Sequence, residues 1–142
     1  MNGLPLHPAL VHVPVGLALV LPLVAAGLAW AIHRKALPRK AWLVVVGLLV
    51  LTLGGAMASL RTGEQEEERV ESVVAESAIE AHEERAEIFT WVAGLLLAVA
   101  VAALVIPSEK ASFALAGVTV AGSVALAVLA MLVGHAGGKI LH

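Results

Sequence analysis

Long apolar runs, separated by short polar segments, make up most of this chain. A helix needs about 20 mostly apolar residues to cross the hydrocarbon core of a bilayer. Four segments meet this requirement, at about residues 9–32, 41–60, 86–106 and 112–133. The short connections between them force neighbouring helices to run in opposite directions. The pattern therefore predicts an all-α fold: an up-down-up-down bundle of four transmembrane helices, forming a single integral membrane domain over residues 1–142.

The segment between the second and third spans has a different composition. Ten of the eleven acidic residues of the chain, all glutamates, lie between Arg61 and Glu87. Apolar residues recur within this segment at roughly helical spacing, at Val70, Val73, Val74 and Ala81. We therefore expect an acidic amphipathic helical connector, lying on the membrane or extending the third helix. A solvated helix face explains its charge without any further function.

The overall composition agrees with an outer surface that faces hydrocarbon. The chain is 60% hydrophobic and 14% charged, with a mean hydropathy of +0.94, whereas a soluble domain averages about half apolar and a quarter charged residues. No basic segment precedes the first apolar run, so we expect a retained transmembrane helix and not a signal peptide. The absence of cysteine excludes disulfides, iron–sulfur clusters and thiolate metal sites.

Proline, glycine and alanine predict local features of the spans. Pro22 lies in the middle of the first span and should kink it. The glycine-rich segment 134–138 should end the fourth helix. Small residues recur every four positions in the third span and in the fourth, as at Gly117, Ala121 and Ala125. Such stripes predict close packing between membrane helices.

The distribution of lysine and arginine predicts the orientation. The first connection is densely basic, and Lys110 in the third connection lies on the same side of the membrane; the residues of the first connection are Arg34, Lys35, Arg39 and Lys40. Short basic loops stay on the cytoplasmic side. We therefore expect a multi-pass protein of the bacterial cytoplasmic (inner) membrane, with both termini and the acidic connector outside.

Histidines provide the main functional signal. The predicted topology brings His7 and His12 at the start of the first helix, His82 near the start of the third and His135 at the end of the fourth to one membrane surface. His142 follows on the same side, and only His33 lies at the other surface. Ionisable groups in or near a membrane often mark function. Each residue alone is also explained as an interfacial histidine satisfied by water or a loop carbonyl, so the shared level is what matters.

A single haem b near the outer face is the first hypothesis, for electron transfer or redox sensing. His82 would be one axial ligand, with His12 or His135 opposite it. Gly16 and Ala86, each one turn from a histidine, would leave room for the porphyrin. The cations available for the propionates are Arg61, Arg85 and Lys139. Because only His33 lies near the inner face, a second haem across the bilayer is not supported.

A divalent metal ion is the alternative, as a bound zinc, copper or iron or as a transported ion. The nitrogen and oxygen ligands would come from His7, His12, His82 and His135 with Glu64 or Glu87. No Glu-x-x-His or His-Glu-x-x-His motif strengthens this reading. Titration of the histidines and glutamates as a proton sensor is a third reading, and a membrane scaffold or accessory subunit without a ligand is a fourth.

The chain resembles a bacterial family of small four-helix membrane proteins that carry a domain of unknown function. The most specific parts of the resemblance are His7-Pro8 through His12-x-Pro14 and Gly134-His135-x-Gly-Gly-Lys139, and it extends over essentially the whole chain. The resemblance implies inner-membrane location and a distant likeness to membrane b-type cytochromes. It thereby implies histidine-ligated haem, carried here onto His12, His82 and His135.

Other classes of function find no support in the sequence. No nucleophile elbow, Ser-His-Asp arrangement or phosphate-binding loop is present, which argues against an enzyme. The basic residues form one short loop at the membrane, which argues against nucleic-acid binding. The expected partners are the lipid bilayer, a redox partner or quinone, and further copies of the chain.

Overall fold

The computed structural model describes residues 6–70 and 76–141, and the side chains of residues 12–61 and 83–132. Its described residues form helices and no strand. The elements are α1 (Leu6–His33), the short 3-10 helix η1 (Arg39–Trp42), α2 (Leu43–Val70), α3 (Glu76–Val105) and α4 (Glu109–Leu141). The predicted all-α fold with four long helices is confirmed.

Each long helix contains a stretch that is long and apolar enough to cross a membrane. These stretches are His12–His33, Arg39–Arg61, Glu83–Val105 and Glu109–Leu132. Their polar ends lie at His33, Arg39 and Glu109 on one side of the bundle and near His12, Arg61 and Glu83 on the other. The protein is therefore a membrane protein with four candidate spans.

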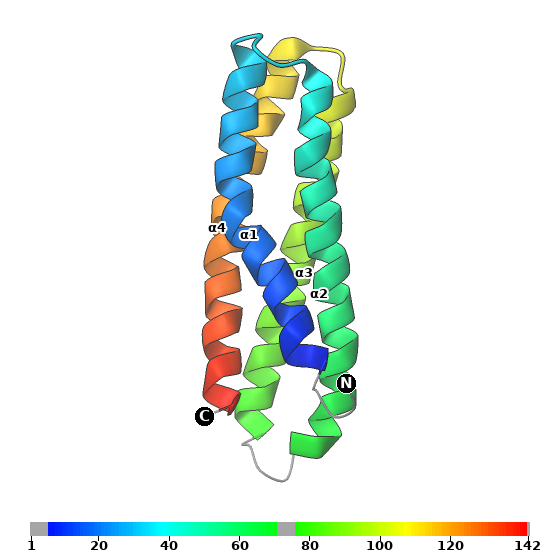
Figure 1. Ribbon diagram of the computed structural model, residues 1–142, viewed down its shortest axis with the longest axis vertical. Helices are drawn as coiled ribbons and strands as arrows, with labels where there is room; N and C mark the ends of the chain where they lie inside the picture. Colours follow the sequence, from blue (N-terminus) through cyan, green and yellow to red (C-terminus); the bar gives the residue numbers. More distant parts are fainter. Residues whose placement is uncertain (1–5, 71–75, 142) are drawn as a thin grey trace.

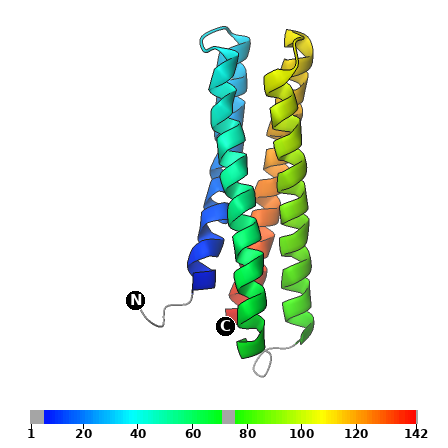
Figure 2. The same cartoon turned by 90° about the vertical axis from the view of Figure 1, so that its right-hand side faces the viewer.

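Helices that follow one another in the chain run antiparallel (Figures 1 and 2). Among the described residues α1 contacts α2 and α4, and α3 contacts α2 and α4, whereas the diagonal pairs do not meet. Figure 2 shows the α1–α2 hairpin beside the α3–α4 hairpin. The start of α1, the end of α2, the start of α3 and the end of α4 lie at one end of the bundle, which we call the acidic end. The two short connections, residues 34–38 and 106–108, lie at the other, the basic end.

The acidic connector extends the long helices. The helix α3 begins at Glu76, as expected for a connector that extends the third helix, and α2 also continues into this segment, to Val70. The end of the fourth helix differs from expectation. The helix α4 does not end at the glycine-rich segment but continues through it to Leu141. Glycine costs a helix only about 1 kcal/mol relative to alanine, so three glycines weaken the last turns without forbidding them.

The core between the helices consists largely of alanine and leucine. The buried face of α1 carries Ala18, Leu21 and Ala25, and comparable residues line the other three helices. Small side chains bring the helices close together. A Cβ on Gly55 of α2, for example, would lie only 3.1 Å from Cδ of Pro14 in α1.

The glycine and alanine stripe of α4 does not pack inside the bundle, contrary to expectation. Gly117, Ala121 and Ala125 are exposed, and nothing lies within 4 Å of a Cβ built on Gly117. The buried face of α4 instead carries Ala116, Thr119, Ser123, Leu126 and Ala130. Both faces of α4 are apolar, so the hydrophobic pattern could not tell them apart.

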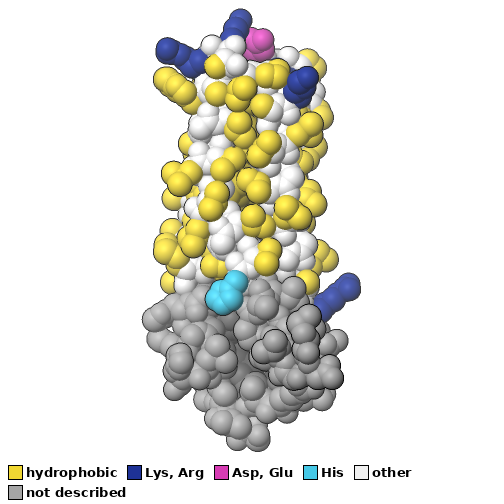
Figure 3. Space-filling model, viewed as in Figure 1, with side chains coloured by type: hydrophobic (Ala, Val, Ile, Leu, Met, Phe, Trp, Pro, Cys, Tyr) yellow, Lys and Arg dark blue, Asp and Glu magenta, His cyan; other side chains and the backbone are white. Residues whose placement is uncertain are grey.

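The flank of the bundle is apolar and the charged side chains gather at its ends (Figure 3). Large side chains such as Leu23, Trp91 and Leu95 extend from this flank and are 78%, 80% and 68% exposed. Lipid chains would cover them in a bilayer. The helix α1 changes direction along its length (Figure 1), as expected for a helix that contains Pro14 and Pro22.

Candidate functional site

The fold brings together the helix segments that carry the predicted histidines. His7 and His12 are in the first turns of α1, His82 is near the start of α3, and His135 is near the end of α4. These three helix ends lie at the acidic end of the bundle, where α2 carries Glu64 (Figures 1 and 2). The side chains of His7, Glu64, His82, His135 and Lys139 lie outside the described side chains. His142 lies outside the described residues.

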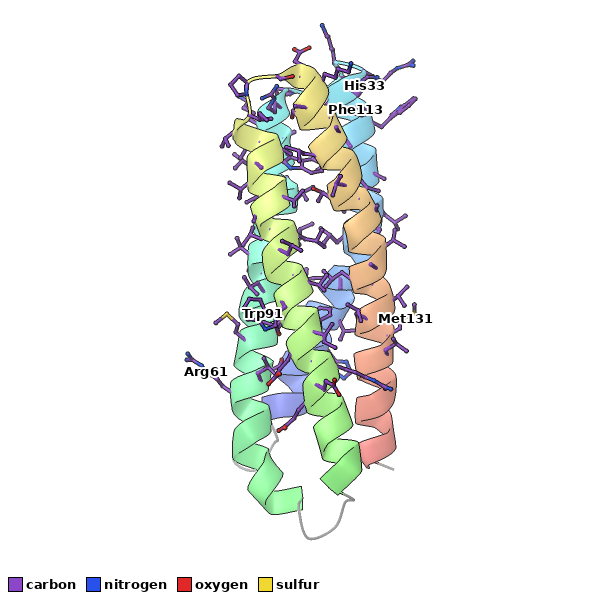
Figure 4. The ribbon with its side chains drawn as sticks, turned by 180° about the vertical axis from the view of Figure 1, so that it is seen from behind. His33, Arg61, Trp91, Phe113 and Met131 are labelled. Atoms are coloured by element: carbon purple, nitrogen blue, oxygen red, sulfur yellow. The ribbon has the colours of Figure 1, made fainter. Side chains whose placement is uncertain are left out.

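The described side chains at the acidic end are mostly exposed. His12 is exposed and stands two residues before buried Pro14, and Gly16 is exposed on the same part of α1. Arg61 extends away from the bundle (Figure 4), and Arg85 and Glu87 are exposed on α3. Within the described part of the chain, no three histidine or carboxylate groups lie close enough together to hold a metal ion.

The basic end holds a cavity that the sequence did not predict. It has a volume of about 490 Å³, is partly open, and is lined by the end of α1, the turn after it, η1, α3 and the start of α4. Its ionisable lining residues are His33, Lys35, Arg39 and Glu109. Its apolar lining includes Ala29, Trp42, Ala103, Phe113 and Ala116.

Two ring contacts lie at the basic end, and one of them is part of the cavity lining. The His33 imidazole stacks on the Phe113 ring, with 4.1 Å between the ring centroids and 24° between the ring planes (Figure 4), and so joins α1 to α4. The guanidinium of Arg34, just after α1, lies 5.2 Å from the centroid of the Trp30 ring, and neither residue lines the cavity.

Three side-chain hydrogen bonds join different segments near the basic end. Nε1 of buried Trp42 donates to the Ala100 carbonyl at 3.0 Å, and the Ser112 hydroxyl donates to the Ala103 carbonyl at 2.6 Å. The Arg39 guanidinium donates to the Ile106 carbonyl, just beyond the end of α3. The last carbonyls of a helix have no partner within the helix. Arg39 and Ser112 therefore complete the end of α3.

The buried hydroxyl groups in the middle of the bundle bond within their own helices. Thr52 and Thr119 donate to the carbonyls of Leu48 and Leu115, four residues earlier, at 2.7 and 2.9 Å. Ser123 donates to the Val120 carbonyl at 2.7 Å. These groups offer no polar pathway between the helices.

Comparison with known proteins identifies the family but no characterised relative. The family model described as "Predicted membrane protein (DUF2231)" matches residues 3–141. No curated protein and no solved structure matches the chain significantly.

Proposed function

The chain belongs to this family of predicted membrane proteins, and from that premise we propose that it is a multi-pass protein of the bacterial cytoplasmic membrane that holds one haem b at its acidic end. The observation that carries the proposal is that three histidine-bearing helix ends lie at this one end of the bundle (Figures 1 and 2). A bound haem b would supply one-electron transfer or redox sensing, with a membrane quinone or redox protein as its partner.

His82 in α3 is the proposed first axial ligand, with His12 in α1 or His135 in α4 opposite it. His12 is exposed on α1.

The remaining residues of the predicted site have supporting roles in this proposal. Arg61 and Arg85 are exposed cations near the surface of the acidic end, where propionates would lie, and Lys139 in the last turn of α4 is the third. Gly16 is exposed, so it does not make room for a porphyrin inside the bundle, and other small residues would have to do so.

The charge distribution supports the proposed orientation. The basic end carries five lysine and arginine residues and one glutamate over residues 33–43 and 106–112 (Figure 3). Short loops with such an excess stay in the cytoplasm, which would place the acidic end and both termini outside. Because the chain has no cysteine, single cysteines can test this directly. An impermeant maleimide added to intact spheroplasts should label Arg61→Cys and leave Ala36→Cys unlabelled, and the reverse result would invert the topology.

The visible spectrum of the detergent-purified protein tests the haem. We expect a Soret band that shifts on addition of dithionite, and its loss in His82→Ala. His7→Ala, His12→Ala and His135→Ala would identify the second ligand, with His33→Ala at the opposite end as the matched control. Protein that stays colourless after haem supplementation during expression contradicts the proposal.

A divalent metal at the same end is the competing function. It would use His7, His12, His82 and His135 with Glu64 or with Glu87, the described carboxylate of this set, which is exposed on α3. Elemental analysis separates the two, because stoichiometric zinc, copper or iron without porphyrin favours the metal ion. A scaffold function is favoured if the purified protein contains neither haem nor metal. In that case the triple variant of His12, His82 and His135 should keep its fold and its partner binding.

A further inference from the structure

The cavity at the basic end combines a cationic rim with an apolar floor. His33, Lys35 and Arg39 line its rim, and Trp42 and Ala116, which are 2% and 7% exposed, line its floor. Its volume of about 490 Å³ falls within the range of about 300–1,000 Å³ that is usual for small-molecule sites. The cavity is therefore large enough for part of an amphiphilic molecule.

The cavity lies at the level where the membrane meets water. His33, Arg39 and Glu109, which line it, are also the end residues of three of the four candidate spans. Residues on its rim would lie among lipid headgroups, and residues on its floor would lie at the depth of the first acyl carbons. A lipid molecule can reach such a site from the side without crossing the bilayer.

The cations of the rim are not neutralised within the described part of the chain. Arg39 is half-buried and donates to the Ile106 carbonyl, and no described carboxylate lies within ion-pairing distance of Arg39 or Lys35. A guanidinium has five N–H donors, so donors remain after that one bond. Glu109 also lines the cavity and reduces, but does not cancel, its positive charge.

The backbone at Lys35 adds a second indication. Lys35 has a φ of 61°, the left-handed conformation that ends α1 and that glycine or asparagine usually occupies. A lysine there costs backbone energy that a glycine would not. The turn thus holds an ammonium group on the rim of the cavity at a position where glycine would fit the backbone better.

From these observations we propose that the cavity is a binding site for an anionic phospholipid. The phosphate accepts hydrogen bonds from Arg39 and Lys35, with His33 beside them, and the glycerol and first acyl carbons cover Trp42 and Ala116. Basic pockets between membrane helices are known to take anionic headgroups. A soluble phosphate compound shares the headgroup chemistry but would leave the apolar floor in contact with water, so the geometry favours the lipid. This proposal does not depend on the haem.

Native mass spectrometry of the full-length protein, released from nanodiscs with equal phosphatidylglycerol and phosphatidylcholine, tests the site. The wild type should retain phosphatidylglycerol in preference to phosphatidylcholine. Lys35→Gln should lower the retained phosphatidylglycerol about five-fold, and Lys35→Gln with Arg39→Gln should lower it further. Arg34→Gln is the matched control, because Arg34 carries the same charge in the same turn but does not line the cavity.

The control and a competition experiment decide the result. Equal loss in Arg34→Gln and Lys35→Gln would overturn the proposal, because it would show attraction to surface charge alone. Displacement of the lipid by millimolar inorganic phosphate or glycerol phosphate would also overturn it in favour of a soluble ligand. If Arg39→Gln fails to fold, because its bond to the end of α3 is lost, Lys35→Gln alone decides, since Lys35 is exposed.

Discussion

Replacement of Trp42 tests how much its contact with α3 stabilises the bundle. Trp42 is 2% exposed, belongs to η1 at the start of the second span, and donates from Nε1 to the Ala100 carbonyl of α3 at 3.0 Å. Trp42→Phe removes the hydrogen bond and keeps an aromatic ring. Trp42→Ala removes both.

The two variants should differ because the ring contributes more than its hydrogen bond. The Ala100 carbonyl lies inside α3 and keeps its helical partner, so Trp42→Phe leaves no orphan acceptor. Hydrogen bonds between membrane helices average about 0.6 kcal/mol, and the smaller ring adds a modest packing loss, so we expect about 1–2 kcal/mol in total. Trp42→Ala empties a buried site and should cost about 3–5 kcal/mol.

Reversible unfolding in mixed micelles of mild detergent and SDS measures these free energies. Trp30 and Trp91 are 61% and 80% exposed, so Trp91→Phe is the matched control and should change the free energy of unfolding by less than about 0.5 kcal/mol. Trp42→Phe as costly as Trp42→Ala would show that the hydrogen bond dominates. Trp42→Ala as mild as Trp91→Phe would refute the packing itself.

Four further substitutions test the rest of the packing by the same unfolding measurement. Gly122→Val should lower the free energy of unfolding by about 1–3 kcal/mol, because a Cβ there would lie 2.3 Å from Leu96 Cδ2. Gly117→Val on the exposed face should change it by less than about 0.5 kcal/mol. Equal effects of the two substitutions would refute the assignment of the buried and exposed faces of α4. Thr52→Val should cost less than about 1 kcal/mol, since its hydroxyl bonds within its own helix; a larger loss would reveal a contact between helices. Ser112→Ala should cost about 1 kcal/mol, because it removes a 2.6 Å bond to a terminal carbonyl of α3, and an unchanged free energy would show that water replaces it.

The spans could be predicted because hydrocarbon thickness sets their length and apolar residues fill them. The faces of the helices could not, since a side chain that faces lipid is as apolar as one that faces a neighbouring helix. Gly117 and Ala121 show this: their spacing indicates close packing, but they lie on the exposed side, whereas Thr119 and Ser123 face inward. The predicted end of α4 at the glycine-rich segment was wrong, because a glycine cluster lowers helix propensity without ending the helix.

The two candidate sites could be predicted to different extents. That the histidine-bearing helix ends lie at one end of the bundle follows from topology alone. The exposure of His12 depends on helix rotation, which the uniform hydropathy of the first span conceals. The cavity at the basic end could not be predicted, because short basic loops are typical of membrane orientation and give no separate signal for a ligand. The contact of His33 with Phe113 could not be predicted either, since Phe113 belongs to a helix far away in the sequence.

The bonds of Arg39 and Trp42 also bear on how the two hairpins are held relative to each other. Both residues follow the turn after α1, and they bond to the Ile106 carbonyl just beyond α3 and to the Ala100 carbonyl inside α3. If α3 slid by one helical turn, about 5.4 Å, both carbonyls would pass out of reach together. These two hydrogen bonds from the first hairpin therefore help to set the depth of the second hairpin in the membrane.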